Sequence, residues 1–426
     1  MEKKGRKQPA KDVPPITANI KIADLVRAYP DVLDVLIKMG FEPLRNAVTR
    51  KIVAKLFTLE QAASFRGVNL EEMLATIRRA AGIEVCEEGS ALRPESSVTE
   101  EGPVPNLKGD ATFLGLVPCP IRSVLLDKFQ AFVQKLTAST GNTVAWWMAG
   151  EGPGIGDVRA WLSRLIEERS FGRIPDLLMG VGTEIFLHKK YGRSLYDEGI
   201  WGTIQTDEIS RLDLRNLEDP GGKLTLQFAV LFVFSCRPDR LPSGVPPRRW
   251  TDLAKPEFKG QVALPSLDLP IIPDLLGALY HYLGEEQFSR LASNIATTLH
   301  PARASPRAGV KDVPGVVILP LHFSKLAIAT GGVQIVPEDG PVAVPAYLAM
   351  KSDASQVAAS VARYLTSKDF LEPFWRLGRL VPNLADIPTD MQFEKLISRP
   401  WEAIFMEDLD AIPDRLISMI KTGGAS

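Results

Sequence analysis

Residues 111–136, ATFLGLVPCPIRSVLLDKFQAFVQKL, contain the local pattern on which the fold prediction rests. The apolar run over 112–117 predicts a buried strand, and apolar residues three and four positions apart over 124–136 predict a helix. The same order of strand and helix returns twice downstream, with strands predicted at 143–148 and 176–179 and a helix at 158–169. Further strands are predicted at 224–234, 261–264, 315–319 and 333–336. This alternation predicts an α/β fold with a parallel sheet covered by helices.

The composition is that of a globular protein with two or three compact units. Of 426 residues, 45% are apolar and 24% are charged, and the net charge of −1 argues against a protein whose main role is nucleic-acid binding. The longest apolar runs, 228–234 and 316–321, are far shorter than the ~20 residues of a membrane span, and the N-terminus resembles no secretory signal. Three widely spaced cysteines offer neither a disulfide framework nor a C-x-x-C pair. We therefore expect a soluble cytoplasmic protein without direct membrane insertion, or a periplasmic one if the start site is misassigned.

Charge and periodicity divide the chain into four segments. Residues 1–17 form a basic tail, and residues 18–83 are predicted to be a small helical domain. Its helix starts include two capping-box patterns, Thr58–Gln61 and Asn69–Glu72. Residues 84–109 are rich in Glu, Ser, Gly and Pro, which is typical of a linker. The α/β pattern occupies residues 110–426.

No motif in the sequence specifies a reaction. The four histidines form no zinc-binding pair, and neither a nucleophile elbow nor a phosphate-binding loop occurs. The glycine-rich stretch 151–156 follows a predicted strand but lacks the spacing of a dinucleotide site. The sequence therefore predicts a protein that is not an enzyme and that holds no metal or cofactor.

The candidate ligand-binding residues lie where predicted strands lead into predicted helices. In open α/β sheets, ligands bind beyond the carboxyl ends of the strands, where helix N-termini expose unpaired amides. Ser123 and Thr183 are predicted helix caps, and Arg122 adds a permanent charge suited to an anion. For any single loop, an ordinary structural connection is the alternative. The ten candidates are Pro118, Cys119, Arg122, Ser123, Gly182, Thr183, Ser266, Asp268, His322 and Ser324.

Three downstream stretches resemble one protein family. PRRWTDLAKPEFKGQVALP (247–265), VPEDGPVAVPA (336–346) and DASQVAASVARYLTSKDF (353–370) are similar, in this order, to motifs of extracellular solute-binding proteins of the iron, polyamine and anion group. The resemblance implies the bilobal type 2 periplasmic-binding fold of transporter substrate-binding proteins, which close on a ligand at a hinge. Lobe 1 would comprise about 110–227 and 346–426, and lobe 2 about 228–345, with crossovers near 228–234 and 342–346. The stretch 319–325 lacks the tyrosine pair of the ferric-ion members.

The helical domain has a second resemblance. Residues 16–77 are similar to a small domain at the N-terminus of iron–sulfur-cluster repair proteins, through Ile22–Leu25, Tyr29–Pro30, Leu36–Phe41 and Thr58–Ala62. Many members carry a cysteine pair after the Gly-Phe, where this chain has residues 42–46 (EPLRN). A metal or redox role is therefore not implied.

The sequence leaves three functions open. The first is non-catalytic binding of a small polar or anionic solute, as a cytoplasmic sensor or carrier that docks a protein partner through the helical domain. The second is an enzyme on the same fold that uses Cys119 as its nucleophile, since a helix N-terminus can lower a thiol pKa. The third is a scaffold whose cleft has lost its ligand.

Overall fold

The computed structural model divides into two compact units, Met1–Ser97 and Val98–Ser426. The predicted tail and most of the predicted linker lie outside the described residues, so the predicted boundaries stay predictions. The described residues are 20–45, 57–77, 106–117, 121–150, 154–299, 314–323, 332–406 and 414–420, apart from 31, 40, 67–69, 71–72, 75, 207, 268, 392 and 416.

The described part of the first unit consists of short helices around a small apolar core. The predicted capping box is confirmed at Thr58, whose N–H donates to Gln61 Oε1 (3.1 Å) while Gln61 N–H donates to Thr58 Oγ1 (3.3 Å). The second capping-box pattern, at 69–72, lies outside the described residues. The helices are α1 (Ile22–Ala28), α2 (Val32–Lys38), η1 (Glu42–Arg45) and α4 (Leu59–Arg66), and the core includes Ile22, Leu25, Val32, Leu36, Leu59, Met73 and Ile77.

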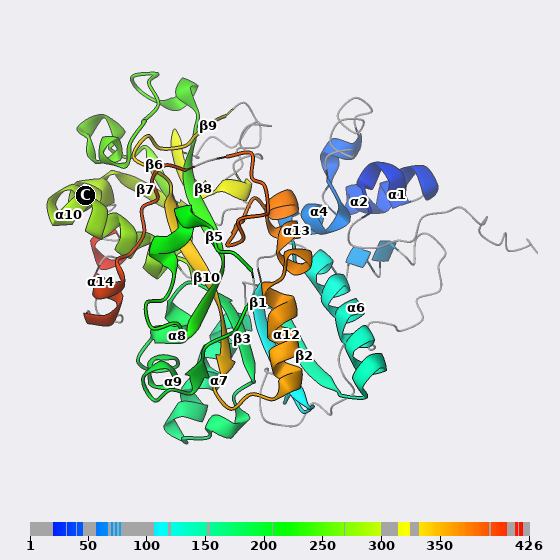
Figure 1. Ribbon diagram of the computed structural model, residues 1–426. Helices are drawn as coiled ribbons and strands as arrows, with labels where there is room; N and C mark the ends of the chain where they lie inside the picture. Colours follow the sequence, from blue (N-terminus) through cyan, green and yellow to red (C-terminus); the bar gives the residue numbers. More distant parts are fainter. Residues whose placement is uncertain are drawn as a thin grey trace, which may run out of the picture. The chain divides into compact units, whose positions relative to one another are not determined.

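The second unit is built on one sheet, in which eleven strands are described, and the strand order is β2-β1-β3-β10-β5-β8-β6-β7 (Figure 1). Strands β9 and β11 also pair with β5, and β4 pairs with β10. The strands are β1 (Ala111–Val117), β2 (Val144–Gly150), β3 (Leu177–Val181), β4 (Trp201–Gly202), β5 (Leu224–Cys236), β6 (Val262–Pro265), β7 (Ile295–Leu299), β8 (Val316–Pro320), β9 (Val333–Ile335), β10 (Val342–Lys351) and β11 (Val381–Pro382).

Two long antiparallel strands join two parallel halves of this sheet. Strand β1 pairs in parallel with β2 and β3, which we call the lobe 1 side, and β6 pairs in parallel with β7 and β8, the lobe 2 side. Strand β10 pairs with β3 of lobe 1, and β5 pairs with β10 and with β8 of lobe 2. The predicted crossover segments lie within β5 and β10, and the predicted bilobal α/β fold is confirmed. Strands β4, β7 and β11 were not predicted.

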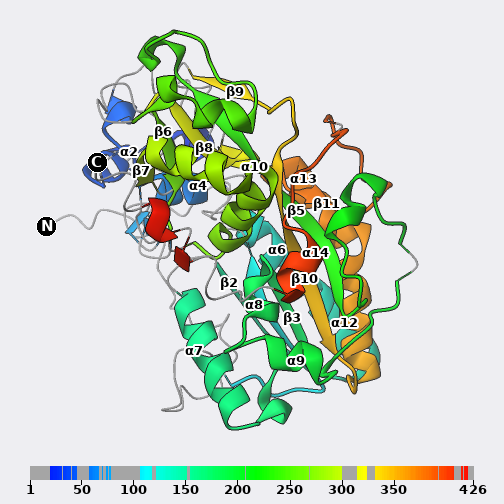
Figure 2. The ribbon, with the colours of Figure 1, turned by 90° about the vertical axis from the view of Figure 1, so that its left-hand side faces the viewer.

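Helices cover both faces of lobe 1. Because β1 lies between β2 and β3, right-handed crossovers place α6 and α7 on opposite faces, and Figure 2 shows α7 on one face with α6 and α12 on the other. Both faces are therefore buried, which explains why β3 is apolar at every position. The helices are α6 (Arg122–Thr140), α7 (Gly154–Glu167), α8 (Glu184–Leu187), α9 (Arg193–Asp197), α10 (Ile272–Asn294), α12 (Gln356–Thr366), α13 (Lys368–Gly378) and α14 (Trp401–Met406), with 3₁₀ turns η3 (Phe171–Arg173), η4 (Leu212–Leu217), η5 (Pro238–Arg240), η6 (Trp250–Ala254) and η7 (Pro256–Phe258).

Two of the three stretches that resemble the family pack against each other. The Trp250 Nε1–H donates to the Gly340 carbonyl (2.9 Å), and the Trp250 backbone N–H donates to Asp339 Oδ2 (3.1 Å). The Trp250 ring is fully buried and meets Phe234 of β5 edge-on at 4.7 Å. These stretches therefore hold η6 against the entry to β10 and have a structural role.

Candidate functional site

Thr183 of lobe 1 and Asp274 of lobe 2 meet between the lobes. Thr183 follows the carboxyl end of β3, and Asp274 is the third residue of α10. The Thr183 N–H donates to Asp274 Oδ2 (2.6 Å), and the Thr183 hydroxyl donates to Oδ1 (2.7 Å). Both side chains are buried. Because a charged acceptor with two donors makes strong hydrogen bonds, this contact fastens α10 to the end of β3.

Glycine at position 182 makes this approach possible. Gly182 has a φ of +86°, and a Cβ there would lie 2.9 Å from Asp274 Oδ2 and 3.1 Å from the Pro270 carbonyl oxygen. Its N–H donates to the Pro345 carbonyl of β10 (2.7 Å). A side chain would thus face both backbone strain and a clash with the carboxylate.

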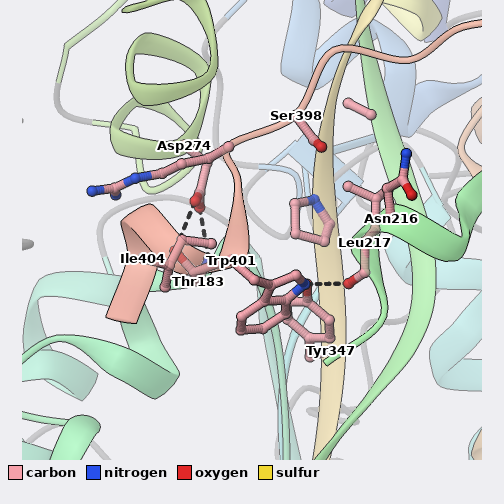
Figure 3. A pocket seen from close by; sticks show the side chains of 11 residues that line it. Thr183, Asn216, Leu217, Asp274, Tyr347, Ser398, Trp401 and Ile404 are labelled. Atoms are coloured by element: carbon pink, nitrogen blue, oxygen red, sulfur yellow. Dashed lines mark hydrogen bonds between the residues drawn. The ribbon is translucent and has the colours of Figure 1, made fainter. Parts of the chain in front are cut away.

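A small cavity lies beside this contact (Figure 3). Its volume of about 10 Å³ leaves room for about one water molecule. The Tyr347 hydroxyl on its floor donates to the Leu217 carbonyl (2.6 Å). The cavity is lined by Thr183, Asn216, Leu217, Asp274, Ala343, Pro345, Tyr347, Ser398, Arg399, Trp401 and Ile404.

Four charged residues form an electrostatic cluster around Thr183. Arg159 of α7 and the Tyr191 hydroxyl both donate to the carboxylate of Glu184, at the start of α8. Burial raises the pKa of Glu184, the Arg159 charge lowers it, and the Asp274 charge raises it. Burial likewise raises the pKa of Asp274, while the charge of Arg399 and the two Thr183 donors lower it. The positive charges of Arg159 and Arg399 therefore offset the negative charges of Glu184 and Asp274.

The raised pKa of Asp274 predicts a pH dependence of stability. A carboxyl with a raised pKa in the folded state binds its proton more tightly than in the unfolded chain, whose pKa is near 3.8. The contribution of Asp274 to the free energy of unfolding is therefore largest below pH 3.8. It falls as the pH rises through that value and levels off above the pKa that Asp274 has in the folded state. We expect the difference in unfolding free energy between wild type and Asp274→Asn to follow this course in urea titrations from pH 3 to 8. A difference that is independent of pH would contradict it.

Two of the predicted candidates differ in role from the prediction. Ser123 is not a helix cap: it is the second residue of α6, and Ile121 holds the N-cap position without a side-chain hydrogen bond. Thr183 does hold the N-cap position of α8, but its hydroxyl donates to Asp274 and caps nothing. Arg122 donates through Nε (3.2 Å) and Nη2 (3.0 Å) to the Met148 carbonyl, which ties the start of α6 to β2.

The other described candidates lie at strand ends. Gly182 is at the Thr183–Asp274 contact, and the Ser266 N–H donates to the Leu299 carbonyl (3.0 Å) at the end of β7. His322 follows β8; its buried Nδ1 has no hydrogen-bond partner, and burial lowers the pKa of the imidazole to about 3, so the ring is neutral at physiological pH. Among the predicted candidates, Thr183 lines the small cavity. Pro118, Cys119, Asp268 and Ser324 lie outside the described residues.

The residues that complete the cluster, Asp274 and Arg399 among them, were not predicted from the sequence. The local sequence could have placed Asp274 in a first helical turn, since an acidic residue beside Pro273 is typical of that position. Nothing in the local sequence indicated its hydrogen-bond partner Thr183, which lies 91 residues away. Arg399 follows no predicted element and carried no signal. Within the described residues, no group of three or more His, Cys, Asp or Glu side chains is placed to hold a metal ion. None of the described helices is long and apolar enough to cross a membrane.

The sheet order and the contact between the lobes define a bilobal α/β protein. Residues 172–401 match the family of bacterial extracellular solute-binding proteins, and the chain belongs to that family. Residues 16–74 match a domain of unknown function, DUF1858, in agreement with the second resemblance. No curated protein sequence matches the chain.

Solved structures share the fold at low sequence identity. The periplasmic binding protein P5PA has 16% identity and a TM-score of 0.52, with 74% of this chain and 100% of that chain covered. AfuA from Actinobacillus pleuropneumoniae, with exogenous fructose-6-phosphate bound, has 15% identity and a TM-score of 0.51, with 73% and 98% covered. Trichodesmium IdiA (FutA), in complex with iron and citrate, has 14% identity and a TM-score of 0.53, with 74% and 99% covered. At such identities the likeness establishes the fold alone.

Proposed function

We propose that the second unit binds a small polar or anionic solute between its lobes, without catalysis, and that closure of the lobes is its output. The observation that supports this most directly is the Thr183–Asp274 contact, in which the end of a lobe 1 strand meets the start of a lobe 2 helix. Gly182, Ser266 and His322 also lie at or just beyond the carboxyl ends of strands from the two lobes, where α/β sheets bind ligands.

The side chains at these strand ends suit a polar ligand with negative charge. Arg122 is the first residue of α6, the helix that follows β1, and it carries a permanent positive charge, whereas Arg159 and Arg399 already face the carboxylates of Glu184 and Asp274. The neutral His322 ring can donate or accept a hydrogen bond but adds no charge. Fructose-6-phosphate and citrate, named with two of the similar structures, are ligands of this chemical kind.

A sensor or carrier in the cytoplasm is the role we propose for the whole chain. The helical unit would bind a protein partner. The lobes of the solute-binding unit would change position when the solute binds. Comparing the full chain with a variant lacking the second unit, in pull-downs at saturating and zero solute, tests whether partner binding follows solute binding.

A ligand panel tests the binding proposal. We expect sugar phosphates, di- and tricarboxylates or oxyanions to raise the melting temperature, because a ligand at 100 times its Kd stabilises the folded state by about 2.7 kcal/mol. A charge-assisted hydrogen bond contributes roughly 1.5–3 kcal/mol, so Arg122→Ala should weaken an anionic hit about ten- to a hundredfold. Binding is measured by thermal shift and then by titration calorimetry.

The control for this variant is Arg169→Ala, because Arg169 is exposed and pairs with Glu198. It should leave the affinity unchanged. If Arg122→Ala binds every hit as tightly as wild type, the loop before α6 is not part of the site. If all hits are cationic, the proposal of an anionic solute fails.

A further inference from the structure

After β10 the chain crosses between the lobes again. Just beyond α13 it is in lobe 1, where Arg379 forms an ion pair with Asp390. Further on, Ile397 is bound to lobe 2 at the entry to β10. Its N–H donates to the Pro341 carbonyl (3.0 Å), and its carbonyl accepts from Ala343 N–H (2.7 Å). The crossovers in β5 and β10 are therefore not the only connections between the lobes.

Arg399 holds this part of the chain on α10 of lobe 2. Its side chain is buried, and a Cβ on Gly277 would lie 2.9 Å from Arg399 Cδ and 3.1 Å from Arg399 Nε. The arginine therefore lies directly on the helix backbone. Its charge also lowers the pKa of Asp274 in the same helix, against the effect of burial.

Trp401, two residues further on, holds the chain on lobe 1. Its ring is buried and lies 6.0 Å from the ring of Tyr347, in the part of β10 that pairs with β3 (Figure 3). Later in α14, the Phe405 ring lies 5.6 Å from the Tyr196 ring and 5.1 Å from the guanidinium carbon of Arg193. Both of these partners belong to α9, so the chain has returned to lobe 1.

Pro400 is the residue between these two anchors, and it is exposed. Because Arg399 and Trp401 are two residues apart, their Cα atoms cannot be separated by more than about 7 Å, whatever the positions of the lobes. Proline fixes its own φ and restricts the preceding residue to extended conformations, so this connection is stiff as well as short. A wider separation of the lobes at this point has to pull Arg399 off α10 or Trp401 off β10.

We propose that Pro400 is an additional joint between the lobes, which limits how far they separate. The limit is covalent, so it holds with and without a solute. The lobes can still rotate about the crossovers in β5 and β10, but only in ways that keep the two anchors together. This inference goes beyond the proposed function, since it concerns the movement of the lobes and not what they bind.

The distance between two spin labels, measured by pulsed electron paramagnetic resonance in the full chain without any solute, tests this limit. The labels are attached at Lys135→Cys on α6 of lobe 1 and at Lys259→Cys after η7 of lobe 2, and both positions are exposed. Cys86 and Cys119 are replaced by serine, and Cys236 is buried and stays. Wild type, which here means this labelled chain, should give a narrow distance distribution.

The test variant carries the sequence Gly-Gly-Ser twice between Arg399 and Pro400. These residues lengthen the connection by up to about 20 Å and are flexible. We expect the distance distribution to become about twofold broader, because the lobes are no longer held together at this point. The same insertion after Gly244, in an exposed turn of lobe 2, is the control and should leave the distribution unchanged.

Pro400→Gly is a second variant, which keeps both anchors but removes the stiffness of proline. It should broaden the distribution to a smaller extent, and it decides the matter if the insertion variant does not fold. An unchanged distribution in the folded insertion variant, or otherwise in Pro400→Gly, overturns the proposal. Equal broadening by the insertion after Gly244 also overturns it. Since no solute is present, either result leaves the proposal of solute binding untouched.

Discussion

Replacing Asp274 by alanine is expected to lower the free energy of unfolding by about 3–5 kcal/mol, because removing one partner from a buried ionic cluster leaves the others without compensation. The Thr183 N–H and hydroxyl would lose their acceptor, and Arg399 would lose the carboxylate whose charge it faces. Urea unfolding followed by circular dichroism at pH 7 measures the loss.

The matched control for Asp274→Ala is Asp239→Ala. Asp239 pairs with Arg237 through a bond of 2.8 Å, but its carboxylate is mostly exposed. Exposed ion pairs contribute about 0.2–1 kcal/mol, so this variant should remain close to wild type. Equal losses from the two variants would show that Asp274 does not fasten the lobes.

Trp250→Ala is expected to cost about 3–5 kcal/mol, the usual range when a large aromatic side chain is removed from a core. The ring is fully buried against Phe234, and its N–H bonds the Gly340 carbonyl. Trp250→Phe separates these contributions, since it keeps an aromatic ring but leaves that carbonyl without its donor, at a cost of about 1–3 kcal/mol for the hydrogen bond.

Trp201 provides the control for the hydrogen bond. Its side chain is as deeply buried as that of Trp250, but its Nε1–H has no hydrogen-bond partner. Trp201→Phe therefore loses ring volume without losing a hydrogen bond, and it relieves a buried unsatisfied donor. We expect Trp250→Phe to be clearly the more destabilising of the two in parallel denaturation curves. A larger loss at position 201 would contradict the role assigned to the Gly340 bond.

Local sequence patterns predicted most of the fold because they reflect burial. Strand β1 and helix α6 follow directly from the apolar run and the helical spacing of 111–136. Strand β7 was missed because its short sequence, IATTL, follows α10 without a turn signal, and β11 because it is two residues long. The family resemblance supplied the two lobes and the two crossover segments between them, which no local pattern contains.

The candidate site was predicted less completely, since its contacts join distant parts of the chain. Gly182 and Thr183 were found because a strand end followed by glycine and a capping residue is a local signal. Asp274 and Arg399 were not among the predicted candidates. The role of each depends on a neighbour that only the folded sheet brings near.

The pairing of β3 with β10 has a consequence for the order in which the chain is made. Leu177–Val181 leaves the ribosome long before its antiparallel partner Ala346–Met350, and all of β6, β7 and β8 is synthesised in between. At 5–20 residues per second, one edge of β3 stays without its neighbour for on the order of 10 s. Lobe 1 therefore completes its sheet only after lobe 2 has been translated, and during that interval an apolar strand edge is available to chaperones or to other nascent chains.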